Sequence, residues 1–134
     1  MIYFVADPST YHRVARTSTH AFATGPSDAE ADELVILGEK RDPRRTLHKQ
    51  VQYLAKMIRA RPAKPGELEA LFPGVGAEQR WKDLVELYWA RPLSAPFNLF
   101  QVDGFDYSAF RNVQTFKRLS ESDAQAVFQH LCKF

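Results

Sequence analysis

The sequence predicts a single domain of the α/β (α+β) class. Its length of 134 residues suits one domain and is short for two. Short apolar runs rich in β-forming residues alternate with stretches of helical periodicity. No internal repeat, low-complexity tract or interdomain linker interrupts this alternation. We therefore expect one domain that covers residues 1–134.

The N-terminal part of the chain predicts a strand, a helix and a second strand. Residues 2–6 are a short apolar run that a polar proline turn ends, which is typical of a strand. Asp7 can cap the helix that follows, with Pro8 in its first position. Residues 32–38 begin with acidic side chains and continue as an apolar run closed by Gly38, which predicts a buried strand.

Two central segments are ambiguous between helix and strand. In residues 46–61, apolar side chains recur at helical spacing, while another set alternates as in a half-buried strand. Periodicity favours the helix, because Leu54 and Ile58 fall on the wrong face of a strand. Residues 80–90 pose the same choice. Periodicity is a weak guide for apolar runs this short.

The later strands and their limits are predicted from turn residues. Residues 97–102 and 112–119 have strand-like patterns. Pro92 and Pro96 each follow a residue that is thereby pushed out of helical geometry, and we expect both prolines to break regular structure.

Two helices are predicted in the second half of the chain. Residues 65–72 form a short helical stretch that Pro73 ends. Ser120 is the expected cap of a C-terminal helix, with Asp123 three residues on as a weak capping-box partner. The apolar face expected on this helix consists of Ala124, Val127, Phe128 and Leu131.

The composition is that of a soluble protein, with 45% hydrophobic and 25% charged residues. No apolar run reaches the roughly 18 residues of a membrane span. The first residues lack the basic start and long apolar core of a signal peptide. Cys132 is the one cysteine, which excludes an internal disulfide and a zinc site built on several thiolates. We expect a reduced, cytoplasmic compartment.

Positive charge is concentrated in the middle of the chain. The net charge is +2, yet residues 40–64 hold nine Lys and Arg against one acidic residue, Asp42. Residues 1–39 carry −4 and residues 65–134 carry −2. Clustered cations are the usual source of affinity for nucleic acid. The alternative is a solvated basic face whose partners are acidic side chains of the other two segments.

Several segments, taken in order, resemble the PUA-like superfamily and within it the EVE type of small domain. The match covers most of the chain. It consists of an opening strand with a polar proline turn, an acidic residue leading a strand, an acidic helix ending in Phe-Pro-Gly, a Trp-led segment, and a closing strand followed by Leu-Ser-x-x-Asp. These pieces are residues 3–8, 32–37, 65–74, 80–93 and 110–123.

This resemblance implies a fold and a function. The fold is a small curved sheet or barrel with peripheral helices, in which residues 50–60 and 81–89 are strands, against the periodicity. The function is association with DNA or RNA, including recognition of a modified base in an aromatic pocket. The expected phosphate contacts lie in the basic segment and are Lys40, Arg41, Arg44, Arg45 and Lys49.

A base pocket needs a flat ring to stack on and a polar group to meet the edge of the base. The candidates for this pocket are Asp7, Ser9, Tyr11, His20, Phe22 and Trp81. The alternative is that most of the seventeen aromatic residues form the hydrophobic core.

Two other functions remain open. Related ASCH domains carry the motif Gly-x-Lys-x-x-Glu-x-Arg, and residues 38–45 match its Gly, Lys and final Arg but have Pro43 in place of the Glu. Proline cannot act as a general base, so we name no catalytic residue. A small hydrolase acting on a nucleoside or RNA is the first alternative. A protein-interaction module of a defence or toxin–antitoxin system is the second.

No metal or cofactor is expected. The four histidines include no His-x-x-x-His spacing, and there is no pair of cysteines. No Gly-rich phosphate loop is present, because Gly74-Val75-Gly76 lacks the lysine that such loops carry.

Overall fold

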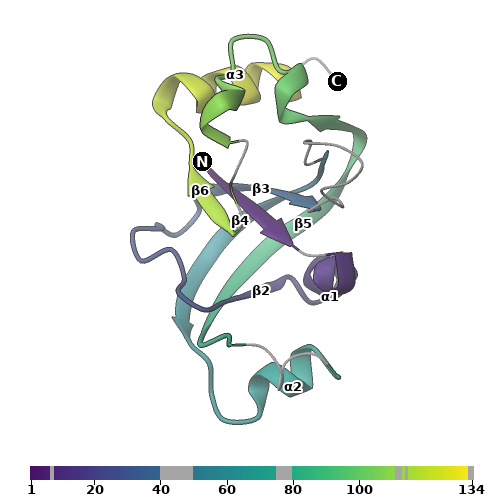
Figure 1. Cartoon of the computed structure of the whole chain (residues 1–134), viewed down its shortest axis with the longest axis vertical. Coiled ribbons are helices and arrows are strands. Elements are labelled where there is room, and N and C mark those ends of the chain that lie inside the picture. The colour runs from purple at the N-terminus through teal and green to yellow at the C-terminus, as the bar shows by residue number, and fades with distance from the viewer. Residues whose placement is uncertain (7, 40–49, 75–79, 111–112, 114, 133–134) are drawn as a thin grey trace.

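The computed structural model describes residues 1–6, 8–39, 50–74, 80–110, 113 and 115–132. Within them the elements follow one another as Figure 1 labels them. They are β1 (Ile2–Ala6), α1 (Pro8–Thr17), β2 (Thr19–Phe22), β3 (Leu34–Glu39), β4 (Gln50–Pro62), α2 (Glu67–Leu71), β5 (Asp83–Asn98), η1 (Leu99–Gln101), η2 (Tyr107–Phe110), β6 (Phe116–Arg118) and α3 (Glu121–Leu131).

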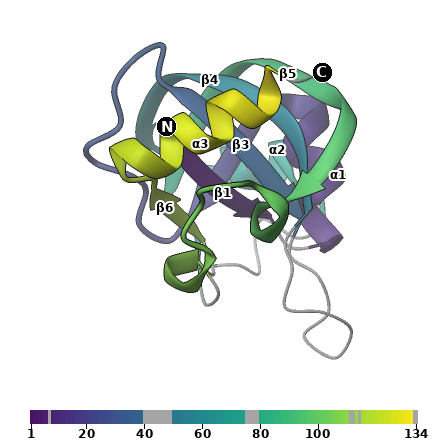
Figure 2. The ribbon, with the colours of Figure 1, turned by 90° about the horizontal axis from the view of Figure 1, so that it is seen from above.

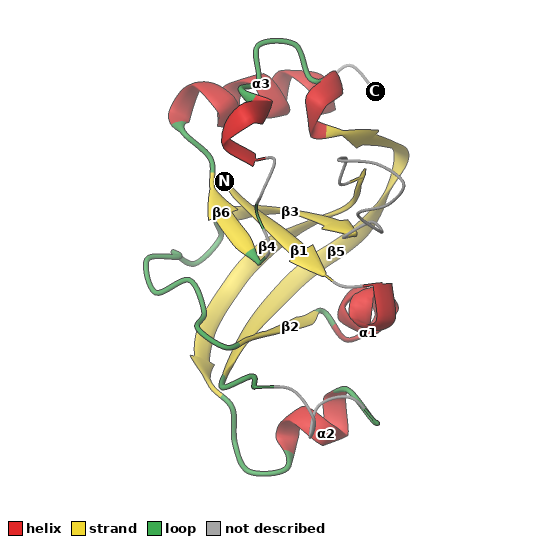
Figure 3. Cartoon of the chain, in the orientation of Figure 1, coloured by secondary structure: helices red, strands yellow, loops and turns green. Residues whose placement is uncertain are grey.

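The six strands form one mixed sheet in the order β2-β5-β4-β3-β1-β6. The β1–β3 pair is parallel, and the other four pairs are antiparallel. No strand pairing in the described part of the chain joins β2 to β6, so the sheet is open rather than a closed barrel. Figure 3 shows the long strands β4 and β5 curving behind the others. The α+β class and the curved sheet with peripheral helices are thereby confirmed.

Strand β1 is buried on both faces and separates two hydrophobic clusters. Successive side chains of a strand point to opposite faces. Phe4 accordingly lies in the first cluster, with residues of α1, β2 and the α2 region, while Tyr3 lies in the second, with residues of α3, η1 and η2. Figures 1 and 2 show α3 lying across one end of the molecule, with α2 at the opposite end in Figure 1.

The resemblance predicted β4 and β5 correctly, and the periodicity did not. Strand β4 has register shifts against β5 between Val51 and Tyr53, between Leu54 and Lys56, and between Met57 and Arg59. Each bulge changes which face the next side chain meets. Val51 therefore packs in the second cluster although Tyr53, two residues further on, packs with the first, whereas Leu54 and Ala55 alternate as in a regular strand.

The prediction that Pro92 and Pro96 break regular structure is wrong. Strand β5 continues through Pro92, which is in register with Tyr53, and through Pro96. Strand β2 pairs only with residues 83–86 of β5. The rest of β5 therefore has no β2 partner to which its backbone must donate, and proline is tolerated at such an edge. The strand predicted over 97–102 is also wrong, because β5 ends at Asn98 and a 3-10 turn follows.

The C-terminal helix begins as predicted and presents a partly different face. The hydroxyl of Ser120 accepts a hydrogen bond from the backbone N–H of Asp123 at 3.2 Å. Val127 is buried as expected, whereas Phe128 is 53% exposed and Ala126 takes a buried position instead. No described helix is long and apolar enough to cross a membrane.

Candidate nucleic-acid interface

Four central strands meet in one row of paired residues. Ala6 of β1 is in register with Glu39 of β3, Glu39 with Gln50 of β4, and Gln50 with Asn98 of β5. We call Ala6, Glu39, Gln50 and Asn98 the strand-end row. Neighbouring strands lie about 4.8 Å apart. Segments that leave the sheet at this row therefore start close together.

Two segments with predicted site residues leave the sheet at the strand-end row. Residues 40–49 join Glu39 to Gln50, and α1 begins two residues after Ala6. Figure 1 shows α1 directly beyond the end of β1. Ser9 and Tyr11 belong to the first turns of α1, and their side chains are outside the described part of the structure. Six predicted residues lie outside the described residues: Asp7, Lys40, Arg41, Arg44, Arg45 and Lys49.

His20 is a buried polar side chain next to the strand-end row. It is 7% exposed, and its Nε2 lies 2.9 Å from the carbonyl oxygen of Val5, next to Ala6. Its Nδ1 lies 3.0 Å from the carbonyl oxygen of Ala21. A carbonyl oxygen only accepts hydrogen bonds, so both contacts are satisfied when both ring nitrogens carry protons.

Phe22 stacks on His20 and is buried in an aromatic cluster. The two rings are parallel within 2°, with centroids 4.1 Å apart. The ring of Phe4 meets both edge-on, at 5.7 Å from His20 and 5.2 Å from Phe22, and Phe116 packs edge-on against Phe22 at 5.2 Å. The structure thus brings His20 and Phe22 together as part of the hydrophobic core, with little ring surface facing solvent.

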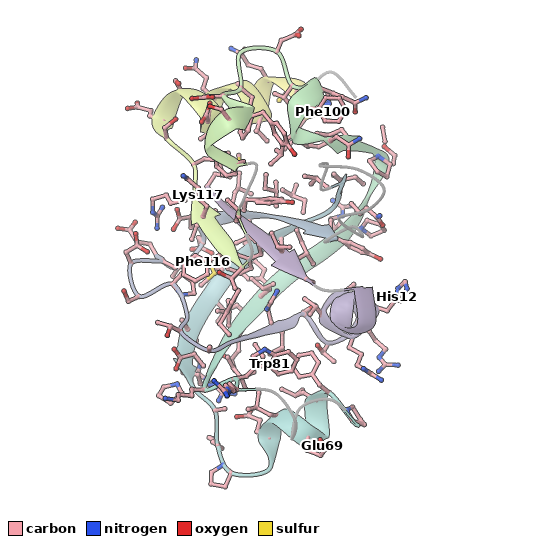
Figure 4. The ribbon with its side chains drawn as sticks, viewed as in Figure 1. His12, Glu69, Trp81, Phe100, Phe116 and Lys117 are labelled. Atoms are coloured by element: carbon pink, nitrogen blue, oxygen red, sulfur yellow. The ribbon has the colours of Figure 1, made fainter. Side chains whose placement is uncertain are left out.

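Trp81 lies near the other end of β2. It is partly buried against the first cluster, and its ring meets Phe72 edge-on at 5.3 Å. The N–H of Lys82 donates to the carbonyl of Phe22 at 2.9 Å, which places Trp81 beside the last residue of β2. Figure 4 shows Trp81 between β2 and α2, away from His12 on the outer side of α1.

The described end of the basic segment is paired with acidic side chains. Arg61 donates to both carboxylate oxygens of Glu67, at 2.7 and 2.6 Å, and its Nε lies 3.3 Å from Glu86. Arg59 forms an ion pair with the same Glu86. The hydrogen bonds from Arg61 lower the pKa of Glu67 to about 2. For Arg59 and Arg61, the alternative to nucleic-acid binding is therefore confirmed: acidic side chains of residues 65–134 pair with them.

One cleft opens beside this ion-pair network. It has a volume of about 160 Å³. Its walls include Arg61, whose guanidinium is engaged by Glu67 and Glu86, and Asp83, whose carboxylate accepts from the backbone N–H of Gly25 at 2.8 Å. Its charged groups thus have partners within the protein. Within the described residues, no group of three or more His, Cys, Asp or Glu side chains is placed to hold a metal ion.

The chain is similar to solved structures of three proteins from different organisms. The ASCH protein of Zymomonas mobilis is 12% identical, with a TM-score of 0.60 over 96% of this chain and 93% of that one. A hypothetical protein from Leishmania major is 11% identical, with a TM-score of 0.64 over 98% and 94%. Human THYN1, solved in complex with DNA that contains 5-methylcytosine, is 11% identical, with a TM-score of 0.58 over 97% and 96%.

These similarities concern the fold. No family model matches the sequence, and a search of curated proteins finds no match. The ASCH protein and THYN1, a PUA-like protein of the EVE type, nevertheless share the arrangement of this chain over nearly its whole length. The chain has the fold of PUA-like domains, as the sequence resemblance implied.

Proposed function

We propose that this protein binds nucleic acid at the strand-end row. Five of the nine cations of the basic segment lie within the ten residues that connect Glu39 to Gln50. The two residues that flank this segment, Glu39 and Gln50, are paired in the sheet. Clustered Lys and Arg bind phosphates by releasing counterions. The fold shared with THYN1, solved with bound DNA, supports the same proposal.

The observation that carries this proposal is the register of Ala6, Glu39 and Gln50. It puts both ends of the 40–49 segment beside the start of α1. Arg59 and Arg61, at the far end of β4, already have acidic partners. At about 3.3 Å per residue, roughly 30 Å of strand separate Arg59 from Gln50. We therefore propose that phosphate binds to residues 40–49 and not to the whole basic segment of residues 40–64.

The finer part of the proposal is recognition of a modified base beside these cations. Asp7, Ser9 and Tyr11 precede or begin α1 and would supply the polar edge and the stacking ring. His20 and Phe22 lie in the core next to the strand-end row, because the His20 imidazole contacts the carbonyl of Val5, the residue before Ala6. Trp81 remains a candidate at the outer end of β2. The 5-methylcytosine in the THYN1 complex makes that base the first to test.

The test is fluorescence anisotropy with labelled duplexes that differ only in cytosine methylation, and with single-stranded RNA, over a series of salt concentrations. If five cations contact phosphate, affinity for the duplex falls by roughly 500-fold between 50 and 200 mM salt. Arg44→Ala with Arg45→Ala should weaken binding to every sequence and reduce the salt slope by about 1.8.

The matched control is Arg59→Ala with Lys64→Ala, which removes the same charge from the far end of β4. We expect this control to bind nearly as the unchanged protein does. Absence of binding at 50 mM salt, or a salt slope near zero, contradicts nucleic-acid binding. Equal losses in the two double variants contradict the assigned location. Equal affinity for methylated and unmethylated duplexes contradicts the modified-base part alone.

A further inference from the structure

The cleft beside the ion-pair network lies at the ends of β4 and β5 that are opposite to the strand-end row. Its walls come from residues 25–27 after β2, residues 60–62 at the end of β4, and Asp83 at the start of β5. Figure 1 shows these strand ends on the side of α2. A cavity of similar size in another protein holds benzene, so the volume of about 160 Å³ suits a ligand of roughly six to eight heavy atoms.

One carboxylate oxygen of Asp83 holds the loop after β2 against the start of β5. This oxygen, Oδ2, accepts the backbone N–H of Gly25 at 2.8 Å. A Cβ at residue 25 would lie 3.2 Å from the Cβ of Asp83, which is tighter than an ordinary van der Waals contact. The absence of a side chain at Gly25 therefore permits this close approach, and the carboxylate stays fixed in the wall of the cleft.

The other carboxylate oxygen of Asp83, Oδ1, is available to a ligand. Among the described residues it has no hydrogen-bond partner, and no cationic side chain lies within ion-pair distance of Asp83. This oxygen is not sealed from solvent. The N–H of Gly25 is a neutral donor and leaves the negative charge in place. A charged donor would form the stronger kind of hydrogen bond with this oxygen.

The positive charge of Arg61, in the same wall, is already balanced. Its guanidinium donates to Glu67 and Glu86, and Arg59 pairs with the same Glu86. Two guanidinium groups thus face two carboxylates, and the charge of Asp83 is left over. The described charged groups at the cleft therefore carry one net negative charge, which favours a cationic ligand over an anion such as phosphate.

We propose that this cleft binds a small organic cation, namely a primary ammonium on a short apolar group. The ammonium donates to Oδ1 of Asp83, and the carbon atoms lie against Pro26, Ala60 and Pro62. The site is separate from the strand-end row, so this inference does not depend on the proposed function.

The experiment follows ¹H–¹⁵N spectra of the protein during titration with benzylammonium chloride at a constant ionic strength of about 100 mM. Benzyl alcohol, which is neutral and of the same size, is titrated in parallel. We expect saturable shift changes at the amides of Gly25, Ser27 and Asp83, with a dissociation constant of about 1–10 mM for benzylammonium. Benzyl alcohol should bind about fivefold more weakly, because it cannot form the ion pair. Equal affinities for the two compounds would overturn the proposal.

Asp83→Asn tests the charge, because it keeps an acceptor for the N–H of Gly25. It should lower the affinity for benzylammonium about fivefold and leave the affinity for benzyl alcohol unchanged. The matched control is Glu30→Gln, which removes one exposed carboxylate from the same loop outside the cleft. We expect this control to bind benzylammonium as the unchanged protein does. Equal losses in the two variants would indicate a general effect of charge and would overturn the assigned site.

Ala60→Leu tests the apolar wall and leaves Asp83 unchanged. Ala60 is exposed on β4, so the fold should tolerate the larger side chain, which takes up space in the cleft. Both compounds should bind at least about fivefold more weakly to this variant. Unchanged binding of both, or no saturable shift change in the unchanged protein up to about 50 mM benzylammonium, overturns the proposal.

Discussion

His20 and Val5 are joined by a hydrogen bond of 2.9 Å, although their strands β2 and β1 are not neighbours in the sheet. Three strands separate β2 from β1 in the sheet order. The contact is possible because the sheet curves until its β2 edge approaches the end of β1. It therefore links the edge of the sheet to the strand from which the proposed interface begins.

Removing the His20 ring nitrogens should destabilise the fold. His20→Phe keeps the stacking on Phe22 but removes the ring nitrogens that contact the carbonyl oxygens of Val5 and Ala21. We expect a loss of about 1–3 kcal/mol in the free energy of unfolding, measured with urea. If His20→Phe left the free energy of unfolding unchanged, the structural role of this contact would be contradicted.

Phe4 should be one of the most sensitive positions of the core. It is fully buried and meets the rings of His20, Phe22 and Phe116. Phe4→Ala should lower the free energy of unfolding by about 3–5 kcal/mol, since it leaves a cavity between packed rings. The exposed Phe128 provides the comparison, because Phe128→Ala should cost well under about 1 kcal/mol. Similar losses at both positions would contradict the described packing.

The Arg61–Glu67 pair should make stability depend on acid pH. The hydrogen bonds from Arg61 lower the pKa of Glu67 from 4.5 to about 2 in the folded protein. A depressed carboxyl pKa contributes stability that is complete above pH 4.5 and is lost as the pH falls toward 2. Unfolding of the unchanged protein and of Glu67→Gln should therefore differ at pH 6 and converge near pH 2. A difference that is independent of pH would exclude this pair as its source.

Arg118 should hold the segment between β2 and β3 in place. Its guanidinium binds the carboxylate of Asp28 at 3.0 Å and also pairs with Glu33, which in turn accepts from the N-terminal amine of Met1. Arg118→Ala should speed amide exchange across residues 26–33 at least tenfold, while residues 54–57 of β4 stay protected. Arg80→Ala, an exposed arginine, is the control. Unchanged exchange in residues 26–33 would show that other contacts hold this segment.

Local sequence signals predicted strands and helix starts correctly where these signals were short and unambiguous. The apolar run 2–6 and the Pro8 start of α1 are found as predicted, as is the Ser120 cap. Strand β3 begins and ends within two residues of its prediction. In each case the information lies within a few adjacent residues, namely a cap, a turn or an apolar run, and long-range packing did not override it.

The features of the fold that were missed or predicted wrongly depend on contacts between residues far apart in the sequence, which no local pattern contains. The bulge of β4 between Val51 and Tyr53 puts these two residues in different clusters, so that Val51 and Leu54, three residues apart as in a helix, share one cluster. Strand β2, four residues long, was missed because its pairing with β5 involves residues more than sixty positions away. The ion pairs of the basic segment also depend on residues that are distant in the sequence. The window 40–64 grouped Arg59 and Arg61 with the phosphate candidates, whereas their acidic partners lie elsewhere in the chain.

Of the predicted base-pocket residues, the sequence could not distinguish rings that stack on a ligand from rings that pack in the core. His20 was a candidate because it can form hydrogen bonds to the edge of a base, and Phe22 because it offers a flat ring. Their burial follows from the curvature of the sheet, which brings β2 against β1. A histidine flanked by small and aromatic residues in an apolar stretch was the one signal that could have indicated a core position.

The most direct test of where nucleic acid binds is an NMR titration of ¹⁵N-labelled protein with a short duplex at about 50 mM salt. The account predicts chemical-shift changes at Ala6, Gln50 and Asn98, with little change at Arg59 and Lys64. Changes centred on Arg59, Arg61 and α2, with the strand-end row unaffected, would contradict it.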